Sequence, residues 1–351
     1  MVKKINPKFP SELRSDPLSG DWVIIATGRG RRPETFRKET RSTSSGQGKK
    51  AIPSKKTCPF CLVKDEKPLL VFAEGERKKK FSKNWTTIVV PNKYPALIPS
   101  KSLNERSEGP YYKKMNGVGF HEVVVTRNHL KSLAQLSLED VVEVINAYQE
   151  RYLDLMNEPF VKYISIFHNH GEEAGASIFH PHSQIIAAPV IDPDLNRSLL
   201  RSQKYFKETG KCIYCKINEW DRKDRKRIVF ENKGFMVICP FASKAAFEVI
   251  ISPKEHSPYF ERISENEKKY LAEALQVSLR KLYKALNDPP YNFYLHTAPS
   301  DGRDYSFYHW HITIIPKTST WAGFELSTGI EISTIEPERA AEYLKQQSYD
   351  L

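Results

Sequence analysis

Long apolar runs are missing from this sequence. No stretch of about 18 consecutive apolar residues occurs, which excludes a membrane-spanning helix. The first residues, Met1-Val2-Lys3-Lys4, lack the apolar core of a secretory signal peptide. We therefore expect a cytoplasmic protein without a membrane partner.

Cysteine is scarce, with five among 351 residues. Four of them form two C-x-x-C pairs, Cys58 with Cys61 and Cys212 with Cys215. In a reducing compartment, this spacing favours metal binding over disulfides. The fifth, Cys239, lies among apolar residues, so we expect it to be a buried and unreactive thiol.

Positive charge is in excess, with 54 Lys and Arg against 42 Asp and Glu and a net charge of +12. Much of the excess lies in short runs such as Lys78–Lys80 and Arg225–Arg227. Such runs are typical of solvated surface, and they also attract anions such as nucleotides and sugar phosphates. Few aromatic residues are interleaved with them, which disfavours a zinc-bearing protein that binds nucleic acid.

One pattern occurs twice along the chain. Each copy contains a C-x-x-C pair, a single histidine, a serine 8 residues after that histidine, and an H-x-H pair. The two copies contain, in this order, His129 and His256, Ser137 and Ser264, and then His180 with His182 and His309 with His311. We infer an internal duplication of two domains, residues 1–196 and 197–351.

Both halves have the same expected elements. Ser137 and Ser264 each begin a helix, and Asp140 and Glu267 complete a capping box three residues later. Alternating apolar strands precede and follow each helix. The short connection around residues 240–247 favours antiparallel pairing. The sequence predicts an α+β fold in which each half is an antiparallel sheet with a packed helix.

Each half also supplies the donors of a tetrahedral metal site. A C-x-x-C pair gives two thiolates, and a zinc ion needs two further donors. We expect His129 and His180 to complete the first site and His256 and His309 the second. Four protein ligands leave no position for water, so we expect two structural Zn²⁺ ions per chain. The alternatives are redox pairs, or one site made of all four cysteines, which the wide separation of the pairs disfavours.

The chemistry is expected at His182. Residues i and i+2 of a strand share a face, so a metal-bound His180 would hold His182 in place. A neutral imidazole has a free lone pair near pH 7, so His182 can attack phosphorus without a separate base. Gln184, again two residues further, can donate an amide N–H to a phosphoryl oxygen.

Small residues precede the first H-x-H pair. Gly175, Ala176 and Ser177 allow the backbone to approach a ligand closely, and their N–H groups can surround a phosphate. The alternative is a plain turn.

The second half carries Thr313 where the first has Gln184. We expect it to be catalytically degenerate, with His311 and segment 323–331 contributing substrate contacts. The role of His296 stays open between support, sugar binding and metal binding.

Four segments occur together in one order along nearly the whole chain. They are residues 13–33, the first cysteine pair, Asn92 to Leu97, and the stretch from Asn169 to Gln184. Together they resemble the galactose-1-phosphate uridylyltransferase family of the histidine triad superfamily. The resemblance implies two histidine-triad-like halves, a homodimer, and a ping-pong reaction between UDP-glucose and galactose 1-phosphate through a uridylylated His182.

The resemblance also implies roles for further residues. The guanidinium groups of Arg29 and Arg32 would contact phosphates. The remaining implied contacts are Asn92 and Tyr94 at the nucleobase and ribose, Asn169 in the active-site core, and Phe324 and Glu325 near the hexose.

Two features depart from the best-studied branch of that family. Cys212 and Cys215 stand where that branch uses a carboxylate and histidines for its second metal, and Glu331 stands where it has a glutamine. The cysteine pair resembles a plant and prokaryotic subgroup whose relatives include an ADP-glucose phosphorylase, and Glu331 leaves the hexose contact open. Uridylyl transfer is the leading hypothesis, and adenylyl transfer from ADP-glucose stays open. Gln184, where related hydrolases carry a third histidine, disfavours hydrolysis.

Overall fold

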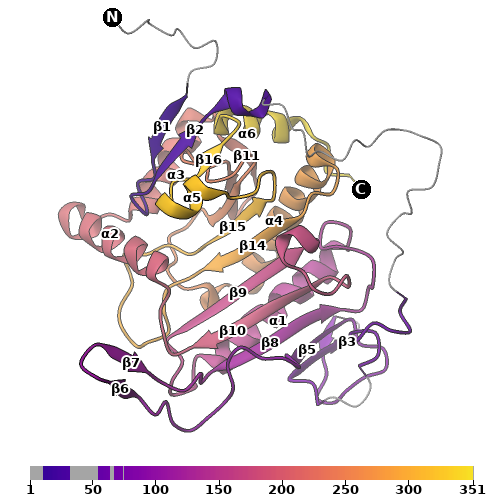
Figure 1. The fold of residues 1–351 in the computed structure, drawn as a ribbon. Helices are drawn as coiled ribbons and strands as arrows, with labels where there is room; N and C mark the ends of the chain where they lie inside the picture. The colour runs from indigo at the N-terminus through magenta and orange to yellow at the C-terminus, as the bar shows by residue number, and fades with distance from the viewer. Residues whose placement is uncertain (1–10, 32–53, 64–66, 74, 351) are drawn as a thin grey trace, which may run out of the picture.

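One continuous antiparallel sheet forms the centre of the protein (Figure 1). The structure is a computed structural model that describes residues 11–31, 54–63, 67–73 and 75–350. In spatial order its strands are β11 (Ile228–Glu231), β12 (Phe235–Ile238), β13 (Val249–Pro253), β15 (His311–Pro316), β14 (Tyr291–His296), β9 (Tyr163–His170), β10 (His182–Ala188), β8 (Phe120–Thr126), β5 (Thr87–Pro91), β3 (Leu70–Ala73) and β4 (Glu76–Arg77). The predicted α+β class with antiparallel strands is confirmed, but the two expected sheets are joined into one.

The remaining elements surround this sheet. The helices are α1 (Leu138–Leu155), α2 (Pro193–Thr209), α3 (Ile213–Asp224), α4 (Glu265–Leu286), α5 (Gly323–Thr328) and α6 (Pro337–Gln346), with short 3₁₀ helices η1 (Thr27–Arg31), η2 (Glu172–Ala174) and η3 (Phe260–Arg262). A small sheet contains β1 (Glu12–Ser15), β2 (Trp22–Ile25) and β16 (Ile332–Ser333), and a hairpin contains β6 (Arg106–Glu108) and β7 (Tyr112–Lys114).

Strands β9 and β14 join the two halves edge to edge. Phe167 lies opposite Tyr294 in their antiparallel register. This pairing satisfies backbone groups that two edge strands would otherwise expose. From the junction outward the order is β9-β10-β8-β5-β3 on one side and β14-β15-β13-β12-β11 on the other. The matching order agrees with an internal duplication, which stays a prediction. The predicted limit between the two domains also stays a prediction, and its last first-domain residue, 196, lies within α2.

Helices α1 and α4 begin at the predicted serines. Ser137 with Asp140 and Ser264 with Glu267 each form a capping box, which satisfies N–H groups that a first helical turn leaves free. The two helices pack against each other and against the sheet, and they share one hydrophobic core.

Strand β10 separates this core from the opposite face of the sheet. Ile185 and Ala187 are fully buried in the core. Ser183 points the same way, and its hydroxyl lies 2.5 Å from the hydroxyl of Tyr148 on α1. Because successive strand residues alternate in direction, His182 and Gln184 lie on the face away from α1.

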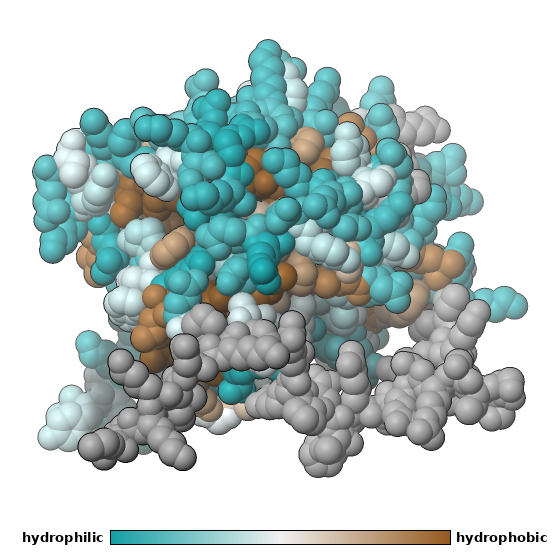
Figure 2. Space-filling model, turned by 90° about the horizontal axis from the view of Figure 1, so that it is seen from above, coloured by the Kyte–Doolittle hydropathy of each residue, from teal (hydrophilic) through white to brown (hydrophobic). Residues whose placement is uncertain are grey.

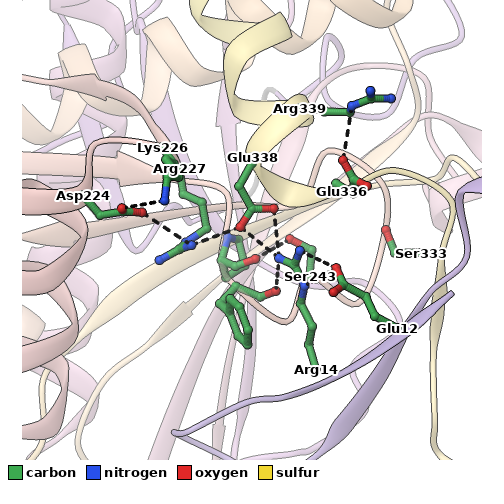
Figure 3. A network of polar contacts seen from close by, with 12 residues as sticks. Glu12, Arg14, Asp224, Lys226, Arg227, Ser243, Ser333, Glu336, Glu338 and Arg339 are labelled. Carbon is green, nitrogen blue, oxygen red and sulfur yellow. Dashed lines mark hydrogen bonds and ion pairs between the residues drawn. The ribbon is translucent and has the colours of Figure 1, made fainter. Parts of the chain in front are cut away.

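The N-terminal strands lie against the second half of the chain. Strand β2 pairs in parallel with β16. Arg14 of β1 donates to Glu338 of α6 at 3.0 Å and to the carbonyl of Phe241 at 3.1 Å. Arg227 donates to the same Glu338 oxygen at 3.0 Å, so this carboxylate lies between two guanidinium groups (Figure 3).

The surface at this end of the molecule is largely hydrophilic, with separate hydrophobic patches (Figure 2). None of the helices in the described part of the chain has the length and apolarity that crossing a bilayer requires.

We predict that Glu338→Ala lowers the free energy of unfolding by about 1–3 kcal/mol, because Arg14 and Arg227 are both mostly buried and both lose an acceptor. Burial opposes ionisation of Glu338, but hydrogen bonds from its surroundings and both arginines outweigh burial and lower its pKa. Its contribution is therefore complete at neutral pH and is lost as the pH falls through this lowered pKa. Chemical denaturation at several pH values measures both effects.

Glu336→Ala is the matched control. Glu336 pairs with Arg339 at the surface, so its loss should cost about 0.5 kcal/mol or less. Equal costs for the two variants would contradict the assigned role of Glu338.

Candidate active site and metal centres

The first cysteine pair lies beside two histidines. Cys61 Sγ is 3.3 Å from His129 Nδ1 and 3.5 Å from His180 Nδ1, and Cys58 Sγ is 3.5 Å from His180 Nδ1. His180 Nε2 donates to the carbonyl of Thr126 at 2.7 Å, so Nδ1 presents its lone pair to the sulfurs. Burial lowers the pKa of His180 to about 4, which keeps the ring neutral at pH 7.

These spacings suit four ligands around one tetrahedral ion. Zn–N bonds of about 2.0 Å and Zn–S bonds of about 2.3 Å place two nitrogen ligands about 3.3 Å apart, and a nitrogen and a sulfur about 3.5 Å apart. The Nδ1 atoms of His129 and His180 are 3.3 Å apart, and the nitrogen–sulfur distances are 3.3 to 3.5 Å. The cluster can therefore hold a metal ion.

The second cluster repeats this arrangement. Cys215 Sγ lies 3.4 Å from His256 Nδ1 and 3.5 Å from His309 Nδ1. With Cys212, the four ligand atoms lie within 4.8 Å of one another. His309 Nε2 donates to the carbonyl of Pro253 at 3.0 Å, the counterpart of the bond made by the first-half H-x-H ligand. All eight predicted metal ligands thus come together in two clusters.

His182 is held in one tautomer. Its Nδ1–H donates to the backbone carbonyl of His180 at 2.9 Å, so Nε2 carries the lone pair. Burial lowers the pKa of His182 below the ordinary histidine value, so the ring is neutral at pH 7. A neutral imidazole with a fixed orientation has the properties of a nucleophile.

Each cysteine loop also supplies an aromatic ring to the neighbouring H-x-H pair. Phe60 packs on His182 with ring centroids 4.9 Å apart, and Tyr214 packs on His311 at 5.3 Å. Sequence reasoning missed both residues, although their place inside a C-x-x-C pair was a signal. The first C-x-x-C segment therefore contacts His182 through a side chain, in addition to the backbone bond between His182 and His180.

Gln184 contacts a histidine that the sequence analysis did not single out. Gln184 Oε1 lies 2.7 Å from His121 Nε2, and the amide nitrogen of Asn92 lies 3.1 Å from the same ring atom. The backbone N–H of Ala96 donates to His121 Nδ1 at 3.1 Å. The structure thus places the predicted nucleobase residue Asn92 beside Gln184. A polar residue at an alternate position of the strand was the only signal for His121.

Asn169 is held by a residue from the second half. Asn292 donates to Asn169 Oδ1 at 2.8 Å and to the carbonyl of Ala174 at 2.7 Å. Gly175 follows with φ +87°, which glycine adopts without strain. The bonds from Asn292 therefore fix the start of the predicted loop. Within that loop Ala176 is half-buried and Ser177 is exposed. Sequence reasoning missed Asn292 because its contact depends on the pairing of β9 with β14.

Three other predicted substrate contacts are Tyr94, Phe324 and Glu325, of which Tyr94 belongs to the same segment as Asn92 and donates its backbone N–H to Asn92 Oδ1 at 2.9 Å. Tyr94 is 82% exposed, and Phe324 is exposed on α5. Glu325 uses its carboxylate to cap α5. In the described residues, no hydrogen bond or ring contact joins these three to His182.

The remaining predicted positions lie near the N-terminal strands or outside the described structure. Arg29 is exposed at η1, and Arg32 lies outside the described residues. Glu331 is buried, with its carboxylate 3.9 Å from the ammonium of Lys244.

A cavity of about 980 Å³ lies over the second half, lined in part by His296, His311 and Thr313. His311 Nδ1–H donates to the carbonyl of His309 at 3.2 Å, and its ring stacks on His296 at 4.7 Å. Burial lowers the pKa of His311 to about 4. His311 thus repeats the geometry of His182, while the Thr313 hydroxyl replaces the amide of Gln184. The volume is that of a small-molecule site.

The family described as galactose-1-phosphate uridyl transferase, N-terminal domain, matches residues 3–192, more than half of the chain. The chain belongs to the galactose-1-phosphate uridylyltransferase family. The family and the transferase class predicted from the sequence are therefore confirmed. A domain of unknown function, DUF4921, matches residues 114–351 of this family member.

Similarity to individual proteins of the uridylyltransferase family spans both halves. An ADP-glucose phosphorylase from Arabidopsis thaliana is 33% identical and covers 96% of this chain and 93% of that protein. A galactose-1-phosphate uridylyltransferase from Thermotoga maritima is 30% identical, covering 97% and 99%. A crystal structure of an Arabidopsis thaliana ADP-glucose phosphorylase with bound ADP-glucose is 32% identical, with a TM-score of 0.80 over 97% of this chain and 99% of that one.

We predict that the purified protein carries about two metal ions per chain, one in each cluster. Cys61→Ala and Cys215→Ala should each remove about one ion, because each cysteine supplies one of four ligands. Elemental analysis of dialysed protein measures the content. Cys239→Ala is the control, because Cys239 is fully buried outside both clusters and should leave the metal content unchanged. Equal metal content in all four proteins would contradict both sites.

Proposed function

We propose that the protein is a nucleotidyltransferase that moves a uridylyl group from UDP-glucose to a hexose 1-phosphate through His182. The observation that carries this proposal is the Nδ1–H bond from His182 to the His180 carbonyl, which leaves Nε2 as a neutral nucleophile. Gln184 lies two residues along the same strand face and brings an amide to the same region. Family membership and the uridylyltransferase from Thermotoga maritima support the choice of substrates.

The reaction consists of two displacements at one phosphorus. Nε2 of His182 attacks the α-phosphorus of UDP-glucose, the bond to the departing oxygen breaks, and glucose 1-phosphate leaves. A phosphate oxygen of the incoming hexose 1-phosphate then attacks the same phosphorus, the bond to Nε2 breaks, and a new UDP-hexose leaves. His182 returns to its starting state, so no external base or acid is consumed.

Zn²⁺ is the proposed ion of both clusters. Two thiolates and two imidazoles are a donor set that zinc prefers, and four protein ligands make a closed, structural site. In the first half, the bound ion would fix His180, whose backbone carbonyl accepts the hydrogen bond from His182 Nδ1–H. The proposed role of zinc is therefore to hold His180 in place, and His182 carries out both displacements.

Other proposed roles follow from the resemblance of the sequence. The N–H groups of Gly175, Ala176 and Ser177 would contact phosphate, and the exposure of this loop supports such a role. The further proposed substrate contacts are Arg29, Arg32, Asn92, Tyr94, Asn169, His311, Phe324 and Glu325. We also propose that the protein is a cytoplasmic homodimer of two duplicated histidine-triad-like domains per chain.

A second candidate is adenylyl transfer from ADP-glucose to phosphate. The relative at 33% identity is an ADP-glucose phosphorylase, and the similar crystal structure contains ADP-glucose. The first displacement at His182 would be the same, and inorganic phosphate would then take the adenylyl group. The two functions differ in the base and in the second acceptor.

We predict that UDP-glucose labelled in its α-phosphate transfers label to the protein and releases glucose 1-phosphate. His182→Ala should reduce the rate of labelling at least about 10³-fold, because it removes the nucleophile. Scintillation counting of precipitated protein measures the label, and metal analysis shows whether the variant keeps its sites.

His311→Ala is the comparison, because His311 has the same local geometry in the second half. This variant should still accept label on His182. A result in which His182→Ala is labelled and His311→Ala is not would transfer the covalent role to the second half.

We predict that UDP-glucose labels the protein at least about 10-fold faster than ADP-glucose at equal concentration, a difference of about 1.4 kcal/mol in transition-state binding. Release of the label by galactose 1-phosphate then completes uridylyl transfer. Faster labelling by ADP-glucose, with release by inorganic phosphate, would establish the second candidate instead.

A further inference from the structure

We propose that His121 is a positioning residue that fixes the amide orientation of Gln184 and couples it to segment 92–96. This inference rests on the proposed function, because it gives the Gln184 amide a role at the transferred phosphoryl group. His121 has no part in the displacements themselves.

The tautomer of His121 follows from its backbone neighbour. The N–H of Ala96 points at His121 Nδ1 from 3.1 Å, and a backbone N–H is only a donor. Nδ1 must therefore accept, and in a neutral imidazole the proton lies on Nε2. The group that faces Gln184 at 2.7 Å is thus an N–H, and it donates to Gln184 Oε1.

This bond selects one of two orientations of the Gln184 amide. With Oε1 bound to His121, the NH₂ group is the part that remains to meet a ligand. A flipped amide would add a second NH₂ group, besides that of Asn92, next to the Nε2–H of His121 and would leave this N–H without its acceptor. His121 therefore presets the amide as a donor, which is the form that an oxygen with growing negative charge requires.

The position of His121 on β8 is fixed from the other face of the sheet. Its neighbour Glu122 accepts two hydrogen bonds from Arg151 of α1, at 2.6 and 2.7 Å, in a buried ion pair. Because neighbouring strand residues alternate, this pair directs His121 to the face that carries Gln184. His121 lies opposite Ile186 of β10, so Gln184 is its diagonal neighbour, within reach of two long side chains.

The same ring is surrounded by the proposed nucleobase segment. The N–H of Asn92 donates to the carbonyl of His121 at 2.8 Å, and Ala96 reaches Nδ1 from the other end of the segment. The Asn92 amide nitrogen lies 3.1 Å from Nε2, and in this tautomer it packs beside the N–H rather than donating to it. Placement of residues 92–96 and orientation of Gln184 therefore depend on one imidazole.

The second half of the protein shows that the sheet does not require the contact between His121 and Gln184. Val249 pairs with Ile314, so Glu248 and Thr313 occupy the places of His121 and Gln184. Glu248 instead accepts the backbone N–H of Lys244. The bond between ring and amide thus occurs in the half that carries the proposed nucleophile.

A double-mutant cycle tests the proposal. His121→Phe keeps a ring but removes the donor, and Gln184→Ala removes the amide. In the wild-type background, His121→Phe should lower kcat of nucleotidyl transfer about 10- to 100-fold. In the Gln184→Ala background the same change should cost about 2-fold or less, because its target is absent. His121→Gln, which restores a donor, should recover part of kcat.

Two readouts separate this role from a general loss of structure. Metal content and the thermal unfolding midpoint of each variant should match the wild type. The imidazole nitrogen shifts of His121 in a long-range ¹H–¹⁵N spectrum, assigned by their loss in His121→Phe, should report the proton on Nε2 without any turnover. If His121→Phe does not fold, the cycle is run with His121→Leu, which also lacks a donor.

Equal costs of the histidine change in both backgrounds, or a proton on Nδ1, would overturn the proposal. A wild-type protein that accepts no label from either nucleotide sugar would instead refute the proposed function, and the tautomer would still be measurable. The two failures are therefore distinguishable.

Discussion

The site depends on one hydrogen bond between neighbouring residues of the H-x-H pair. His182 can present Nε2 only while Nδ1 donates to the carbonyl of His180, and that carbonyl is fixed because the His180 side chain is held twice. One ring nitrogen bonds to Thr126 and the other faces two cysteines. A cluster that can hold a metal ion, a backbone carbonyl and the proposed nucleophile are thus connected in three consecutive residues, which explains why the spacing is the same in both halves.

The sheet adds a second constraint, because the alternation along its strands decides which side chains lie on each face. Alternation along β10 sends Ile185 into the core and His182 to the opposite side. The pairing of β9 with β14 brings Asn292 from the second half to Asn169 in the first. The first half alone would lack this contact, so the junction between β9 and β14 contributes to the candidate site as well as to the fold.

Much of this arrangement could be predicted from the sequence, because it is encoded locally. Ser137 with Asp140 marks the start of a helix within four residues, and C-x-x-C with H-x-H marks both clusters. The continuous sheet could not be predicted, since edge pairing between β9 and β14 leaves no pattern in either strand. His121 and Asn292 were missed for the same reason: each acts through a partner on another strand, and neither belongs to a motif. Arg32 lies outside the described residues, so its role stays a prediction.

The contact between Arg14 of β1 and Glu338 of α6 affects the order in which the protein folds during synthesis. Arg14 and Glu338 are separated by 324 positions, and β2 pairs with β16 near the other end of the chain. Chains emerge from the ribosome N-terminus first, and the early parts fold as they appear. Strands β1 and β2 contact residues near Phe241 and Ala242 as well, but they gain their remaining partners only after β16 and α6 have been synthesised, so this part of the fold is completed late.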